Sequence, residues 1–81
     1  MIFVKIFVSI CTDNGMGFEI KTVEAKSFEQ AIKKIGWKKI EKEIANPKNA
    51  GFGKPIGILT KTKVWSYKSF RLNKAKKICK K

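Results

Sequence analysis

Residues 2–11 alternate between two kinds of side chain, and this alternation constrains the fold more than any other feature of the chain. The even positions are all β-branched aliphatic residues, whereas the odd positions mix aromatic, basic and small side chains. Successive side chains of a β-strand point to opposite faces of its sheet, so this period predicts a strand with one face in a core. Because the other face is also partly apolar, we expect this strand at the centre of the sheet.

A hairpin is predicted to follow the first strand. Residues 12–17 have the composition of a turn, in which Asn14 and Gly15 tolerate positive φ angles. Residues 18–25 predict the returning strand. Its apolar residues change face part-way along, and a β-bulge near residues 21–22 would reconcile the two halves.

Two short helices are predicted after the hairpin. Ser27 and Gln30 have the spacing of a capping box, which indicates the start of a helix. The apolar residues before and after Gly36 lie on nearly opposite sides of a single straight helix. Glycine commonly ends helices in a left-handed conformation, so we expect one helix at residues 27–35 and a second, reoriented helix at 37–45.

The second half of the chain predicts a loop, a third strand and a last helix. Residues 46–55 are rich in Gly, Pro and Asn and predict a loop, in which Phe52 is either an exposed stacking residue or a plug at the core's edge. Residues 56–67 alternate again and predict one continuous strand. Residues 69–80 predict a helix capped by Ser69. The apolar stripe of this helix consists of Leu72, Ala75, Ile78 and Cys79.

These elements predict a small α+β fold of order ββααβα in one domain spanning residues 1–81. A hairpin followed by a right-handed helical crossover places the third strand beside the first. The sheet would then be three-stranded and antiparallel, with strand order 2-1-3. The sheet face expected to pack against the first helix carries Ile2, Val4, Ile6, Val8, Ile56, Ile58 and Val64.

Positive charge is concentrated toward the C-terminus. The net charge of +13 divides into −1 over residues 1–30, +5 over 31–60 and +9 over the basic segment 61–81, which contains no acid. Such an excess predicts a polyanion partner, although solvated lysine-rich faces would give the same composition. Only one of the 19 cations is arginine, which argues against finely specified recognition of bases or phosphates.

The composition argues against an enzyme. The chain has no His and 6 carboxylates, and it shows no nucleophile constellation from which to build a catalytic site. Cys11 and Cys79 cannot complete a four-ligand zinc site, although they could form one disulfide if they lie close together. The apolar start lacks the pattern of a signal peptide and is too short to span a membrane. We expect a non-enzymatic cytoplasmic protein with reduced thiols and neither metal nor cofactor.

The odd-numbered side of residues 56–72 mixes cations with aromatic rings and is the main candidate for a binding site. Cations neutralise phosphates, and nucleobases stack on aromatic rings. We predict that the protein binds RNA or single-stranded nucleic acid at low specificity, mainly through the phosphate backbone. The predicted phosphate contacts are Lys61, Lys63, Arg71, Lys74 and Lys77, and the predicted stacking residues, if exposed, are Trp65 and Tyr67.

Three alternatives compete with this prediction. The C-terminal helix could cover the same face and form a second small core with Phe3, Phe7, Trp65 and Tyr67. Because a short chain needs every apolar contact, we expect this arrangement, which leaves the lysines of residues 61–81 to contact phosphate. Alternatively, the chain is a protein-interaction module, such as an accessory subunit or a small phage-type inhibitor, that docks on an acidic protein or a nucleic-acid-processing complex. A membrane-surface role is the weakest alternative, because the apolar stripe of the last helix is narrow.

Overall fold

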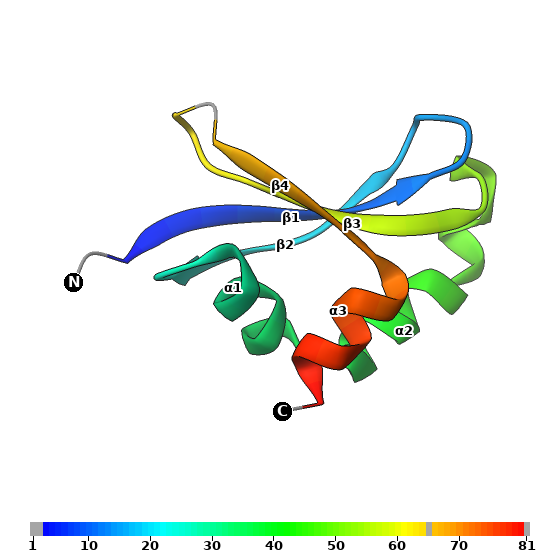
Figure 1. Ribbon diagram of the computed structural model, residues 1–81. Helices are drawn as coiled ribbons and strands as arrows, with labels where there is room; N and C mark the ends of the chain where they lie inside the picture. Colours follow the sequence, from blue (N-terminus) through cyan, green and yellow to red (C-terminus); the bar gives the residue numbers. More distant parts are fainter. Residues whose placement is uncertain (1–2, 65, 81) are drawn as a thin grey trace.

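The computed structural model describes residues 3–64 and 66–80. Its elements are β1 (Val4–Thr12), β2 (Phe18–Ala25), α1 (Phe28–Ile35), α2 (Trp37–Ala45), the 3-10 helix η1 (Pro47–Phe52), β3 (Pro55–Lys61), β4 (Tyr67–Arg71) and α3 (Leu72–Cys79). The strands form one antiparallel sheet of order β2-β1-β3-β4, and α1, α2 and α3 all lie on one side of it (Figure 1). The predicted α+β class with an antiparallel sheet is therefore confirmed.

The core lies between the three helices and one face of the sheet. In β1, Ile6, Val8 and Ile10 are at most 1% exposed, as the even positions of this strand predict. Ile58 and Thr60 of β3 extend the same buried face, and the Thr60 hydroxyl donates a hydrogen bond of 2.8 Å to the Lys68 carbonyl oxygen. The helices contribute Ala31, Ile32, Ile40, Ala75 and Ile78.

Three residues predicted for this core are exposed instead. Val4 begins β1, Ile56 lies at the start of β3, and Val64 lies in the turn after it; their exposed fractions are 40%, 54% and 75%. Alternation predicts the face on which a side chain lies, but not how far along the strand the helices extend. Ile2, predicted for the same face, lies outside the described residues.

In the first half of the chain, the elements predicted from local sequence signals are present in the structure. The Ser27 hydroxyl accepts a hydrogen bond of 3.1 Å from the Gln30 amide, and Gln30 Oε1 accepts one of 2.6 Å from the Lys26 amide. Gly36, with φ of +85°, separates α1 from α2. The two predicted helices are confirmed. The bulge in β2 lies at Ile20, one residue before the predicted position.

The prediction of one continuous strand over residues 56–67 is wrong. The chain reverses after Lys61, and Tyr67 pairs directly with Lys61 across a hairpin in which the Thr62 amide donates a 2.8 Å hydrogen bond to the Ser66 carbonyl oxygen. This hairpin adds β4 at the edge, so the sheet order is 2-1-3-4 rather than 2-1-3. The turn contains no Gly, Pro, Asn or Asp, and therefore gave no turn signal in the sequence.

The last helix begins later and packs elsewhere than predicted. Ser69 does not cap it, because Ser69 pairs with Leu59 inside β4 and the helix begins at Leu72. Its apolar stripe is confirmed, but it packs against α1 and α2 on the core side (Figure 1). The expected second core beneath this helix on the opposite sheet face is therefore wrong. None of the described helices is long and apolar enough to cross a membrane.

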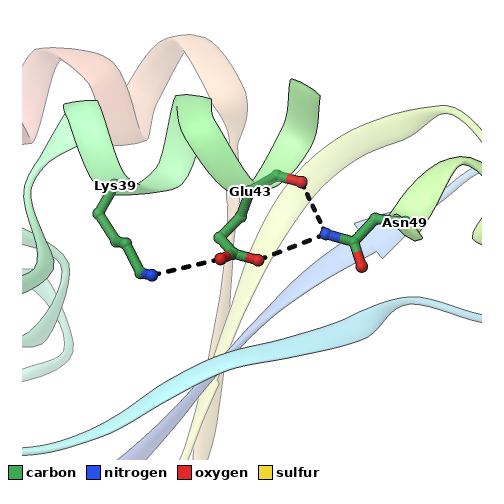
Figure 2. A network of polar contacts seen from close by, with 3 residues as sticks. All are labelled: Lys39, Glu43 and Asn49. Carbon is green, nitrogen blue, oxygen red and sulfur yellow. Dashed lines mark hydrogen bonds and ion pairs between the residues drawn. The ribbon is translucent and has the colours of Figure 1, made fainter. Parts of the chain in front are cut away.

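Side chains on the helical side hold the connection between α2 and β3. Phe52 packs against Phe18 with 5.3 Å between ring centroids, so it plugs the edge of the core rather than standing exposed. Asn49 Nδ2 donates to the Glu43 carbonyl oxygen at 2.8 Å and to Oε2 at 3.3 Å, and Lys39 Nζ lies 3.3 Å from Glu43 Oε1 (Figure 2). Glu43 thus anchors η1 to α2 and neutralises one lysine of the helical layer.

Candidate nucleic-acid interface

The sheet face turned away from the helices is not covered by any described element (Figure 1). Its side chains are the odd-numbered ones of β1, β3 and β4, which alternate with the core residues. Cross-strand pairing arranges them in rows, and we call these rows together the open face. The rows are Phe7, Lys61 and Tyr67; Ser9, Leu59 and Ser69; and Cys11, Gly57 and Arg71.

The open face presents aromatic and aliphatic surface as well as charge. Tyr67 is 70% exposed, and Phe7 and Leu59 are half-buried beside it. Lys61 and Arg71 are both exposed. A ring that stands free beside cations on a flat surface is available for stacking, which the expected burial of Tyr67 would have prevented.

A groove of about 550 Å³ lies at the end of the open face nearest the β3–β4 turn. It is lined by Phe7, Leu59, Lys61, Thr62, Lys63 and Tyr67, among others. Leu59 also borders a second hollow of about 500 Å³, and Cys11 joins that hollow to a third of about 370 Å³ that reaches Arg71. Three shallow hollows therefore lie along the open face between the turn and Arg71, and Glu19 of β2 borders the second of them.

Charge is distributed unevenly across this side of the sheet. The exposed cations Lys61, Lys63 and Arg71 lie on β3, β4 and their turn, and neither ion pair found among the described residues involves them. Glu19 and Glu24 lie on β2, where they pair with open-face positions of β1. An anion on the open face would therefore lie over β3 and β4, away from β2.

The structure divides the predicted site residues between two sides of the molecule. Lys61, Tyr67 and Arg71 lie together on the open face, and Lys63 lines the groove from the turn. The exposed Lys74 and Lys77 belong to α3, so they lie in the helical layer on the other side of the sheet. Trp65, the other predicted stacking residue, lies outside the described residues.

The two apolar residues of the groove other than Tyr67, Phe7 and Leu59, were not predicted as binding residues. The sequence analysis expects Phe7 in the second core, and Leu59 is not among the predicted contacts. The sequence does contain a signal for both, because they occupy odd positions of the two alternating stretches and therefore lie on the same face as Lys61. What the sequence did not indicate is that this face remains uncovered.

Cys11 is the cysteine on the open face, and its surroundings affect its protonation state. Burial raises the pKa of the Cys11 thiol above its ordinary value, so this thiol is protonated and uncharged at neutral pH. Cys79 lies in α3 on the core side, and both thiols are free. In the described part of the chain, no three His, Cys, Asp or Glu side chains come together as a group that could hold a metal ion.

The chemistry of the open face indicates which kind of ligand it suits. Comparisons of the chain with protein-family models, curated proteins and solved structures found no match. Among the described residues, the open face offers cations that take part in neither ion pair, one exposed and one half-buried ring, aliphatic surface at Leu59 and small hydroxyl side chains. This combination suits a ligand that is anionic at regular intervals and also carries flat rings.

Proposed function

We propose that this protein binds nucleic acid, either RNA or single-stranded, and contacts mainly its phosphate backbone through the open face. The observation that supports this best is the presence of exposed cations and a 70% exposed tyrosine ring on one uncovered sheet face. Lys61, Lys63 and Arg71 neutralise phosphates. Trp65, predicted to stack, follows Lys63 in the same segment.

The charge of the whole chain strengthens this contact over a longer range. A net charge of +13 attracts a polyanion from beyond contact distance and raises its local concentration. Lys74 and Lys77 of α3 contribute to this attraction, but they do not contact a nucleic acid that is bound to the open face. Two lysines are partly compensated by acids of the helices: Lys68 of β4 lies 3.3 Å from Glu29 of α1, and Lys39 of α2 lies 3.3 Å from Glu43.

We further propose that recognition depends little on base sequence. Lysine is a point charge on a flexible stem, whereas sequence readout typically uses groups that form paired hydrogen bonds with a base. Arg71 is the only arginine on the open face and in the chain. Phosphate contacts fix the position of a nucleic acid but carry no sequence information.

The salt dependence of binding tests this proposal. A labelled oligouridylate is titrated with the protein at several salt concentrations, and affinity is followed by fluorescence anisotropy. If Lys61, Lys63 and Arg71 each neutralise one phosphate, log K should fall against log salt with a slope of about −2. Absence of binding even at low salt would contradict the proposal.

A competition experiment separates nucleic acid from an acidic protein as the partner. Polyglutamate carries negative charge at regular intervals but has no bases and no phosphates. The proposal predicts that polyglutamate displaces the oligouridylate only weakly at matched charge concentration. Equal or tighter binding of polyglutamate would contradict it and would favour docking on an acidic protein.

A further inference from the structure

We infer that the groove beside Phe7, Lys61 and Tyr67 is a subsite for one unstacked nucleobase, and that the protein therefore selects single strands over duplexes. This inference rests on the proposed function and adds a base contact to the phosphate contacts. The groove has a volume of about 550 Å³, which lies in the range of small-molecule sites, roughly 300–1,000 Å³.

Strand pairing determines how the groove is built. Lys61 of β3 pairs with Phe7 of β1 on one side and with Tyr67 of β4 on the other. Neighbouring strands lie about 4.8 Å apart, so the backbones that carry the two rings are roughly 10 Å apart, with Lys61 between them. Leu59, two residues before Lys61 on the same strand, supplies an aliphatic floor. A planar ring can rest on this apolar surface against Tyr67.

The cations around the groove fit the backbone of the same nucleotide. Lys61 lies between the two rings, and Lys63 lines the groove from the turn. A base held against Tyr67 therefore has a lysine close by for its flanking phosphates. Glu19 and Glu24 lie on β2, on the far side of β1 from the groove, so acids do not border it.

The position of the groove on a sheet face explains the expected preference for single strands. Bases in a duplex are stacked and paired inside the helix, and a ring on a flat protein surface cannot reach them. A single strand can turn a base outward at a small cost in free energy, because that base is not paired. A duplex would then contact only the cations of the open face and would lose the stacking contribution.

The observations favour a nucleobase over an apolar side chain of a protein partner. The groove is flanked by two lysines, and the segment that carries them, residues 61–81, has no acid. A purely apolar partner would leave those charges without compensation. A nucleotide can stack its base on the rings and pair its phosphate with the lysines.

An abasic oligonucleotide tests the subsite separately from the phosphate contacts. Affinities are measured for an oligouridylate, the same oligonucleotide with abasic residues, and a duplex of the same length. The variants are Tyr67→Ala, Tyr67→Phe and the control Val64→Ala, which removes a 75% exposed apolar side chain from the same hairpin outside the groove lining. Each variant is first checked for native folding by circular dichroism.

Loss of one stacked base should weaken binding by about 5- to 150-fold. We expect Tyr67→Ala to show this loss with the intact single strand but not with the abasic strand or the duplex. Tyr67→Phe keeps the ring and should restore most of the affinity, and Val64→Ala should bind like the parent protein. Equal affinity of the parent protein for intact and abasic strands, or tighter binding of the duplex, would overturn the subsite while leaving phosphate binding intact. If neither strand binds at low salt, the proposed function itself fails.

Discussion

The two faces of the same sheet have opposite properties, although they are built from alternating residues of the same strands. In β4, Phe70 is 5% exposed and packs into the core, whereas Tyr67, three residues earlier, is 70% exposed. In β3, Ile58 is buried and its neighbour Leu59 borders the groove of the open face. Three helices cover one face, and no described element covers the other (Figure 1).

This difference separates stability from binding. Burial of apolar side chains provides most of the favourable free energy of folding, and here it occurs on the helical side. Residues of the open face contribute less burial, so substitutions there should change binding without unfolding the protein. Substitutions on the two faces of the sheet test this separation.

The strongest contrast is expected between the two aromatic residues of β4. Phe70→Ala should lower the free energy of unfolding by about 3–5 kcal/mol, because it removes a large side chain from the core. Tyr67→Ala should change it by about 0.5 kcal/mol or less, since this side chain is mostly in water. Urea denaturation followed by circular dichroism measures both values. Equal destabilisation by the two variants would show that the open face is not free.

Neutralising two cations at a time should show which side of the sheet binds the nucleic acid. The variant with Lys61→Gln and Arg71→Gln loses two charges from the open face, and the variant with Lys74→Gln and Lys77→Gln loses two from α3. The first should weaken oligouridylate binding by roughly 10- to 30-fold at 0.1 M salt and make its salt slope shallower by about 1.4. The second should leave the slope nearly unchanged. Equal slopes in the two variants would contradict contact through the open face.

Neutralising the acids of β2 should strengthen binding. Glu19 and Glu24 pair with Ser9 and Lys5, so they repel an anion that lies over the neighbouring strands. The variant with Glu19→Gln and Glu24→Gln should bind oligouridylate about two- to five-fold more tightly at low salt. The gain should disappear at high salt through screening. Unchanged or weaker binding by this variant at low salt would show that these acids do not repel the bound nucleic acid.

The smallest expected effect concerns the contact between the edge strand and α1. The Glu29 pKa lies below its ordinary value of 4.5, because the carboxylate accepts a hydrogen bond from the Glu29 amide and pairs with Lys68 at 3.3 Å. Since the folded pKa is the lower one, the contribution to stability is present above pH 4.5 and is lost as pH falls through the folded value. Glu29→Gln should cost about 1 kcal/mol or less at neutral pH and less still at acid pH. A loss of stability independent of pH would contradict this account.

The elements that the sequence predicted well are those with local signals. The capping residues Ser27 and Gln30 define the start of α1, and Gly36 defines its end. The alternation in residues 2–11 correctly assigns Ile6, Val8 and Ile10 to the core. In each case the determining interactions lie within a few residues along the chain.

The elements that the sequence did not predict depend on tertiary contacts. Thr60, Thr62 and Val64 continue the β-branched pattern through a turn that has no Gly, Pro, Asn or Asp, so the sequence did not indicate the hairpin between β3 and β4. That error also misplaced the last helix, because β4 has to be present before the chain can return to the helical side. The cations of the site were identified from composition, but their division between two sides required the structure.

The most direct test of the account is to map the binding surface by NMR. Amide chemical shifts of the protein are recorded while oligouridylate is added at low salt. The account predicts that the largest changes occur at Phe7, Lys61, Tyr67 and Arg71, and that the amides of α3 change little. Largest changes at Lys74 and Lys77, with the open face unaffected, would contradict it.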